Sequence, residues 1–256
     1  MVNVLGIPFY DQNLQAAVAE TIDACAKDYL PQNHCISASG AHGLVEAHKD
    51  PTFKKVLQQF WRNLPDGMPT VWIGRLKGAK HIQRCYGPDF FKEMMLASAN
   101  LPINHFICGG NEGVAEELKK ACSVKFNNNN VVGTYYPPFR EMTEEEMQEL
   151  ANQIAQSGAH IVWIGLSAPK QEKFSFRLAK FTQVHFIVAV GAAFDFHTDR
   201  VRQAPHWMRQ SGLEWFFRLM MEPKRLYKRY VEVVPLFILL NIKELLQYIF
   251  KKKSGL

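Results

Sequence analysis

The chain has few of the features that stabilise a fold through covalent or metal cross-links. Its five cysteines are an odd number, are widely spaced and contain no CxxC pair. A chain of 256 residues can bury roughly 75% of the surface of its unfolded form, so it needs no cross-links to be stable. We therefore expect five free, buried thiols in a reducing compartment.

Targeting and membrane-spanning signals are also missing. Residues 1–15 lack a basic stretch followed by an apolar core, so we expect no secretory signal. No uncharged apolar run reaches 18 residues, and the run at 233–242 is too short to span a bilayer. We accordingly expect no transmembrane helix.

Several common catalytic signatures do not occur. The chain has no HExxH, no GxxxxGK[ST] loop and no GxSxG elbow. It also lacks Asp-x-Asp, with which many sugar-nucleotide transferases hold Mg²⁺ or Mn²⁺. A bound diphosphate would have to be met by helix N-termini, hydroxyls and Arg or Lys side chains. We expect no metal or other cofactor.

Positive charge gathers at one end of the chain. Residues 1–204 hold 20 basic and 20 acidic side chains, whereas residues 205–256, called the appendage below, hold 10 basic and 4 acidic ones. The appendage has a helical pattern, which we expect to be interrupted at Pro223 and Pro235. It could be a helical cap with a solvated basic face, or helices lying on an anionic membrane surface. Its high apolar content argues against binding to nucleic acid.

Residues 1–204 alternate strand-like and helix-like segments, beginning with a strand at 2–9. Apolar runs at 103–110, 160–166 and 184–194 read as strands between helical patterns of 10–16 residues. Such continuous apolar strands are buried on both faces, which indicates a mainly parallel sheet covered by helices on both sides. We expect an α/β core over 1–204 and the helical appendage over 205–256.

Ligands of such a sheet bind beyond the C-terminal ends of its strands. Four polar stretches are expected there: 37–42, 65–67, 109–113, and 164–174 together with 191–195. The glycines of 109–113 could cradle a phosphate or could serve turn geometry alone. Asp66, between Pro and Gly, could be a simple turn residue or a rigidly placed general base.

The stretch 164–174 reads IGLSAPKQEKF. Pro169 suits the first position of a helix, and the free N–H groups of residues 170–172 would then point past the strand end. Lys170 and Gln171 are thus candidates for ligand contacts, while Glu172 could serve the helix dipole.

Three of these stretches, taken with two more, resemble the bacterial WecG/TagA/CpsF family of glycosyltransferases over nearly the whole chain. The matching pieces are PDG at 65–67, GPDF at 87–90, GGNEG at 109–113, IGLSAPKQEKF at 164–174, VGAAFDF at 190–196 and the basic stretch 204–230.

The resemblance implies an inverting glycosyltransferase with a Rossmann-like, three-layer core. It would move a sugar from a UDP-sugar, typically UDP-N-acetylmannosamine or its uronic acid, onto a polyprenyl-diphosphate-linked sugar. The reaction would take place on the inner face of the plasma membrane, in polysaccharide synthesis, with the appendage closing over the site and touching the membrane.

The resemblance also carries roles over to individual residues. Asp66 would be the general base, Gln171 would lie near the sugar-nucleotide and Asp195 on the nucleotide side. The expected catalytic residues are Asp66, Ser37 and Arg84. The expected substrate-binding residues are Ser39, His42, Gly109, Gly110, Asn111, Tyr135, Lys170, Gln171, Asp195, Arg218, Arg225 and Arg229.

One departure from the family pattern concerns the donor. The usual T-x-N-x-x-H reads Ser37-Ala-Ser39-Gly-Ala-His42 here, and Ser39 lacks the separate donor and acceptor of an amide. The donor sugar could therefore be a hexose instead of an N-acetylhexosamine.

Two other functional classes also stay open. One is a nucleotide-binding oxidoreductase, although residues 131–139 lack the acid that usually holds the ribose of a nicotinamide dinucleotide. The other is a non-catalytic UDP-sugar-binding protein. The sequence leaves the oligomeric state open, a homo-oligomer included.

Overall fold

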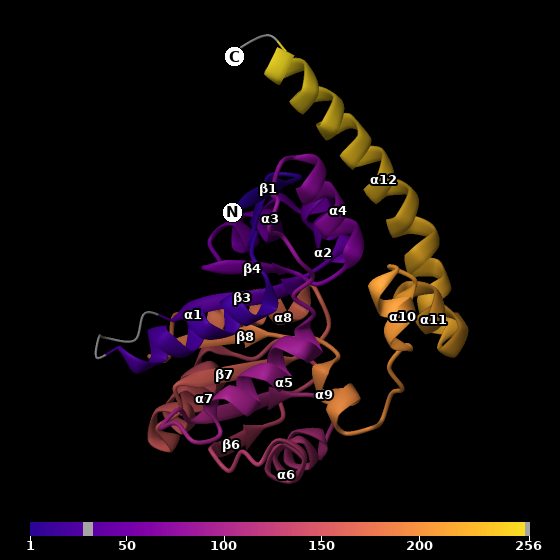
Figure 1. The fold of residues 1–256 in the computed structure, drawn as a ribbon. Helices are drawn as coiled ribbons and strands as arrows, with labels where there is room; N and C mark the ends of the chain where they lie inside the picture. Colours follow the sequence, from indigo (N-terminus) through magenta and orange to yellow (C-terminus); the bar gives the residue numbers. More distant parts are fainter. Residues whose placement is uncertain (28–32, 254–256) are drawn as a thin grey trace.

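The computed structural model describes residues 1–27 and 33–253. Its centre is an eight-stranded sheet in the order β1-β2-β4-β3-β8-β7-β5-β6 (Figure 1). Only the β1–β2 pair is antiparallel, so the predicted mainly parallel sheet is confirmed. The strands are β1 (Val2–Val4), β2 (Ile7–Phe9), β3 (His34–Ser39), β4 (Arg62–Pro65), β5 (His105–Gly109), β6 (Val131–Tyr135), β7 (Ile161–Gly165) and β8 (Phe186–Ala189).

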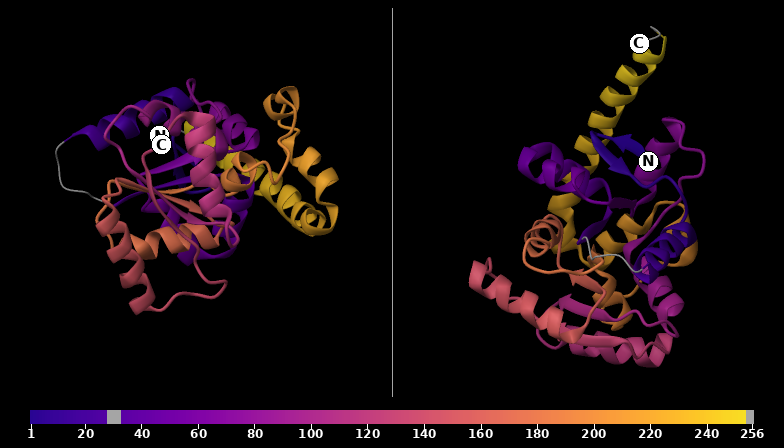
Figure 2. Two further views of the ribbon diagram at one scale, coloured as in Figure 1. Left: turned by 90° about the horizontal axis from the view of Figure 1, so that it is seen from below. Right: turned by 90° about the vertical axis from the view of Figure 1, so that its left-hand side faces the viewer.

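Helices cover both faces of this sheet, as the left view of Figure 2 shows. Within the described residues they are α1 (Leu14–Ala26), α2 (Ala41–Lys49), α3 (Pro51–Gln58), α4 (Met68–Leu76), α5 (Gly87–Ser98), α6 (Val114–Phe126), α7 (Glu144–Ser157), α8 (Lys170–Leu178), α9 (Ala193–His197), α10 (His206–Gln210), α11 (Glu214–Met221) and α12 (Pro223–Lys253).

The strand β7 shows why helices must pack on both faces of the sheet. Its side chains alternate between two apolar clusters: Trp163 packs with residues of α1, α5 and α6, and Val162 with residues of α7 and α8. Because successive side chains of a strand point to opposite faces, a strand that is apolar at every position must be buried on both.

The N-terminal and β4 regions differ from what the sequence pattern predicts. Residues 2–9 form a two-stranded hairpin whose turn, Leu5-Gly6, has φ values of 53° and 82°, as a tight hairpin turn requires. The four residues of β4 escape the pattern because they include the buried Asn63, whose amide donates to the carbonyls of Pro8 and Leu57. The apolar stretch after β4 is the helix α4.

All five cysteines are free and buried, which confirms that expectation. Each lies in an apolar cluster or against the polypeptide backbone, and burial raises the pKa of Cys25 and Cys35 to about 12. The thiols therefore act as small apolar side chains.

The appendage differs from expectation at one of its two prolines. Pro223 begins α12, but Pro235 lies inside that helix without interrupting it. The inner face of α12 packs on the core through Val233 and Phe237, and Glu244 accepts hydrogen bonds from the backbone N–H of Leu5 at 2.9 and 3.0 Å. In the right view of Figure 2 the end of α12 projects past the N-terminal hairpin.

The uninterrupted helix α12 contradicts our expectation that no helix could span a bilayer. Within residues 223–250, α12 contains an 18-residue segment with a mean hydropathy of 1.6, so it is long and apolar enough by length and composition. The apolar run is extended because Pro235 does not end the helix. Only 17% of this 18-residue segment is buried inside the structure.

A testable feature of the sheet is the close approach of β5 and β7, which pair at Gly109 and Gly165. A Cβ on Gly109 (φ +134°) would lie 2.7 Å from the carbonyl oxygen of Gly165. We expect Gly109→Ala to lower the free energy of unfolding by about 3 kcal/mol or more, since backbone strain and overpacking add.

Gly78→Ala is the matched control, because Gly78 has φ +97° but open space around it. It should cost only the backbone strain, about 1–2 kcal/mol. Urea unfolding of both variants measures the difference; equal losses would show that the β5–β7 contact is not the constraint.

Candidate active site

The parallel strands bring their polar C-terminal ends to one cavity of about 1060 Å³. Five strands contribute to its lining, because each ends at the same edge of the sheet. The contributions are Ser39 of β3, Asp66 after β4, Gly110 after β5, Gln171 after β7 and Gly191 after β8. The four polar stretches identified in the sequence therefore meet.

Asp66 lies at the junction of β4 and α4, not in a tight turn. Its backbone N–H donates to the carbonyl of Ser39 at 3.1 Å. Its Oδ1 accepts from the N–H of Gly87 at 2.8 Å. Burial raises the pKa of Asp66 to about 6, against the opposing effects of the Arg84 charge and the Gly87 hydrogen bond. Because the pKa lies near neutral pH, this carboxylate can accept a proton.

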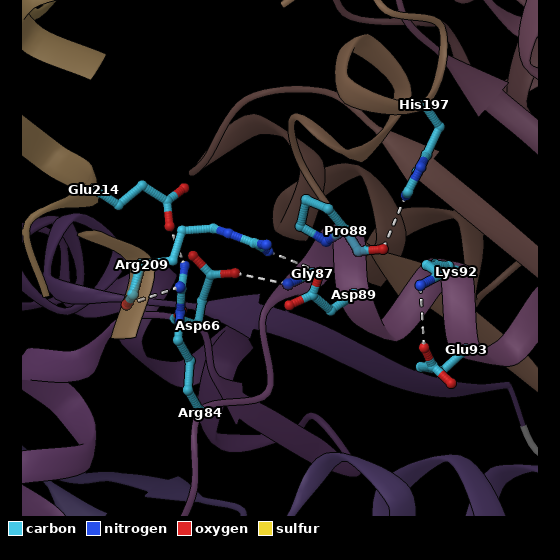
Figure 3. A network of polar contacts seen from close by, with 10 residues as sticks. All are labelled: Asp66, Arg84, Gly87, Pro88, Asp89, Lys92, Glu93, His197, Arg209 and Glu214. Carbon is cyan, nitrogen blue, oxygen red and sulfur yellow. Dashed lines mark hydrogen bonds and ion pairs between the residues drawn. The ribbon is translucent and has the colours of Figure 1, made fainter. Parts of the chain in front are cut away.

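Arg84 is fixed by partners from both the core and the appendage (Figure 3). Its Nε donates to the carbonyl of Asp66 at 2.6 Å, and its Nη1 to the carbonyl of Arg209 at 3.3 Å. The third partner is the carboxylate of Glu214 at the start of α11, which forms an ion pair with Nη2. The guanidinium carbon also lies 4.1 Å from the ring centre of Tyr86. The orientation of Arg84 is therefore set before any ligand arrives.

The appendage also contributes a cluster of arginines to the cavity. Arg218, Arg225 and Arg229 all line it. Burial first, and then the charges of Arg225 and Arg218, lower the pKa of Arg229. The Nε of Arg218 is buried without a hydrogen-bond partner among the described residues. Positive charge thus gathers here in excess of what the neighbouring carboxylates balance, as expected of an anion-binding site.

A buried polar network lies beneath the cavity floor. Oε1 of Glu172 accepts from the hydroxyl of Ser37 and from the amide of Gln171, each at 2.9 Å. Ser37 also hydrogen-bonds Ser39 at 2.9 Å, and Gln171 accepts from the N–H of Gly191 at 3.0 Å. Burial is the main cause of a raised pKa for Glu172. The network links three strand ends and holds the Gln171 amide in place.

The start of α8 differs from the sequence prediction in two ways. Pro169 is the residue before the helix, one position earlier than expected, and follows a cis peptide bond. The N–H of Gln171 donates to the carbonyl of Ser167 at 3.1 Å, so this group is not free. Glu172 lies in the first turn of α8, where the sequence placed it, and its buried carboxylate bonds to Ser37 and Gln171.

Most of the expected site residues line the cavity. Among the predicted residues, Ser37, Gly109 and Tyr135 do not: Ser37 lies in the buried network, Gly109 in the β5–β7 contact, and Tyr135 ends β6 next to the lining residue Tyr136. Those that do line it are Ser39, His42, Asp66, Arg84, Gly110, Asn111, Lys170, Gln171, Asp195, Arg218, Arg225 and Arg229.

Several lining residues were missed in the sequence. Tyr86 directly precedes the GPDF motif, and Glu214 lies in the basic stretch 204–230, so both stood beside recognised signals. Trp72 of α4 had no signal, since its segment was not assigned to an element. Among the described residues, no group of three or more His, Cys, Asp or Glu side chains is placed to hold a metal ion.

Comparison with known proteins agrees with this geometry. The model of the glycosyl transferase WecG/TagA/CpsF family matches residues 2–251. The chain belongs to the WecG/TagA/CpsF family. It is 28% identical over 240 residues, 93% of this chain and 90% of the relative, to the N-acetylglucosaminyldiphosphoundecaprenol N-acetyl-beta-D-mannosaminyltransferase of Bacillus subtilis (strain 168).

Membership of the WecG/TagA/CpsF family makes the chain a glycosyltransferase. The oxidoreductase and the non-catalytic binding protein, the two other classes that the sequence left open, are thereby set aside. Among the residues that carry the resemblance, Asp66, Gln171 and Asp195 line the cavity described above.

The buried network gives a test of how this glycosyltransferase holds Gln171. Glu172→Ala removes the acceptor of two hydrogen bonds, so we expect it to lower the free energy of unfolding by about 2 kcal/mol or more. Glu172→Gln keeps an acceptor oxygen and should remain close to wild type near pH 4.5.

The pH dependence separates the two roles of Glu172. Since its folded-state pKa is raised above about 4.5, the folded protein binds the proton more tightly, and this contribution to stability is lost as pH rises. Glu172→Gln should therefore gain stability relative to wild type between pH 4.5 and 7.5. Urea unfolding at both pH values measures this; a difference that does not change with pH would contradict it.

Proposed function

We propose that the enzyme transfers a sugar of the N-acetylmannosamine type from a UDP-sugar to a lipid-diphosphate-linked saccharide, with inversion at the anomeric carbon. The proposal is supported by the 28% identical relative, whose name gives an N-acetylmannosaminyl group and a diphosphoundecaprenol acceptor. It is supported further by a cavity that is large enough for a sugar nucleotide and is lined with cationic side chains.

The observation that carries the proposal is the pairing of Asp66 with the arginine cluster in one cavity. Inversion needs one displacement, in which the acceptor oxygen bonds to the anomeric carbon while the bond to the diphosphate breaks. The proton of the acceptor hydroxyl passes to Asp66, and UDP leaves with its electron pair. A base is therefore needed on one side of the sugar and cations on the other.

Asp66 suits the base. In water a carboxylate of pKa near 4 is a weak base, but burial raises the pKa of Asp66 to about 6. Its Oδ1 is held by the N–H of Gly87, which fixes the direction of the carboxylate. The group is thus ionised at neutral pH and still basic enough to take a proton in the transition state.

Arginines suit the leaving diphosphate. Arg84, Arg218, Arg225 and Arg229 line the same cavity, and a guanidinium is always charged and can bind two phosphate oxygens at once. We propose that these side chains meet the developing negative charge without a metal ion.

The donor is the less constrained of the two substrates. Ser37 is buried and bonded to Glu172, so of the two serines that replace the family's Thr and Asn only Ser39 borders the cavity. A serine there offers a single hydroxyl where an amide would offer two groups. Because of Ser39, a UDP-hexose is the second candidate donor.

We further propose that the enzyme works as a peripheral protein on the cytoplasmic face of the plasma membrane. The support is the outward face of α12, where large apolar side chains are exposed: Leu239, Leu246 and Phe250. In the sequence, lysines and arginines at 224–229 precede these residues and three lysines at 251–253 follow them. An apolar face with flanking cations is typical of helices that lie in the interface of an anionic bilayer.

Asp66→Asn tests the base. We expect kcat to fall on the order of 10²-fold or more, with UDP affinity nearly unchanged, measured by UDP release and by UDP titration. In wild type, kcat/KM should fall tenfold per pH unit below about pH 6 and level off above it, because Asp66 must be ionised.

Asp199→Asn is the matched control, because this exposed aspartate pairs with Lys125 outside the cavity. It should leave both quantities close to wild type. Turnover of Asp66→Asn at the wild-type rate would exclude Asp66 as the base.

Two substitutions on the outward face test the membrane placement. Leu239 and Leu246 are 64% and 51% exposed, so Leu239→Gln with Leu246→Gln should spare the fold. Deletion of the appendage would not, since Val233 and Phe237 complete an apolar cluster. Binding to phosphatidylglycerol vesicles should drop at least tenfold, given the apolar area lost.

The control is an apolar-to-glutamine substitution on the surface of α6. Val124 on α6 is 84% exposed, and Val124→Gln should leave vesicle sedimentation unchanged. If the double variant sediments with vesicles as well as wild type does, α12 is not the membrane contact.

A further inference from the structure

The cavity has two chemically different ends. The end over β3, β5, β7 and β8 is lined by polar and cationic side chains. The other end lies between α4 and α12, next to one another in Figure 1, and is lined almost entirely by apolar ones: Met68, Pro69, Trp72 and Ile73 of α4, and Val234, Phe237, Ile238, Ile242 and Leu245 of α12. This apolar end is called the α4–α12 groove below.

The groove side of α12 is a separate stripe of that helix. Val234, Ile238, Ile242 and Leu245 follow each other at intervals of three or four residues, so they share one face. That face is neither the core-packed one around Val233 nor the outward one proposed to meet the membrane. One amide lies within the stripe: Asn241, whose Nδ2 donates to the carbonyl of Phe237 at 2.8 Å and whose Oδ1 has no partner among the described residues.

Large apolar side chains stay exposed along this groove. Trp72 is 45% exposed, and Ile238 and Ile242 are each 52% exposed. The tip of the Trp72 ring is fixed by Gly212, where a Cβ would lie 2.8 Å from the indole. Apolar area that is held open in a formed groove fits an apolar ligand better than water.

The groove begins at the proposed base. Met68 and Pro69 form the first turn of α4, directly after Asp66 and Gly67. A lipid-diphosphate acceptor that puts its sugar hydroxyl at Asp66 and its diphosphate among the arginines must send its chain onward from there. The α4–α12 groove continues from that point in the same cavity.

We propose that the α4–α12 groove binds the first isoprenoid units of the acceptor's lipid chain, so that the chain is held by protein before it enters the bilayer. This inference rests on the proposed function. The bilayer alone, or a second copy of the chain in the groove, are the competing occupants that the experiment must separate.

The experiment compares two soluble acceptors, sugar diphosphates carrying one or three isoprene units, used below their micelle-forming concentrations without vesicles. UDP release by the full chain should give a kcat/KM at least tenfold higher for the three-unit acceptor, because more apolar surface is buried. Trp72→Ala and Leu245→Gln should each reduce this ratio at least threefold. Leu246→Gln, one residue further along α12 and on its outward face, should keep it.

A second measurement covers variants that fold poorly. A three-unit acceptor with a diazirine on its chain, photolysed on the wild-type protein, should label residues 68–73 or 234–245. Labelling elsewhere would overturn the proposal, as would a chain-length ratio near one in wild type or unchanged in both groove variants. A mass by sedimentation that falls from dimer to monomer in the groove variants would assign the groove to a second copy.

The two levels of the argument fail differently. If no lipid-diphosphate acceptor of either length releases UDP, the proposed function falls and the groove assignment with it. If both acceptors react equally well, the proposed function stands and the groove assignment alone is overturned.

Discussion

The guanidinium of Arg84 ties together three segments that are far apart in the sequence. It is hydrogen-bonded to the carbonyls of Asp66 and Arg209 and ion-paired with Glu214. Arg84 thereby helps to hold the appendage over the cavity, and its charge opposes the effect of burial on the pKa of Asp66. A lysine could not replace it, because three partners in different directions need a planar, multi-donor head group. Core and appendage thus share one residue of the candidate site.

The arginine cluster shows a conflict between stability and function. Burying Arg229 beside Arg218 and Arg225 opposes its charged state, and the Nε of Arg218 has no partner among the described residues. Such an arrangement costs folding energy and is expected where a ligand supplies the missing negative charge. The floor formed by Glu172 and its neighbours has such an atom too: Oε1 of Glu172 accepts two hydrogen bonds, whereas its Oε2 is buried without a partner among the described residues.

Much of the fold could be predicted because strands such as β7 are apolar at every position. The site followed from the strand ends: Asp66 and Gln171 both line the cavity. The misses have local causes. The strand β4 depends on tertiary hydrogen bonds of Asn63, which no local pattern contains. The buried bond of Glu172 to Ser37 joins residues 135 positions apart in the chain, so the local pattern around Glu172 could not show it. Pro235 was expected to end α12, but it is exposed on the outward face.

The 100° step between successive residues of a helix makes α12 sensitive to one kind of mutation. Three consecutive residues serve three surroundings: Glu244 bonds to the hairpin, Leu245 lines the groove and Leu246 faces outward. Single substitutions alter one surrounding at a time. Insertion of one residue before Glu244 would turn the rest of the helix by about 100°, placing the glutamate in the groove and Leu245 on the outward face. The rotational position of these residues around the helix axis therefore matters as much as their side chains.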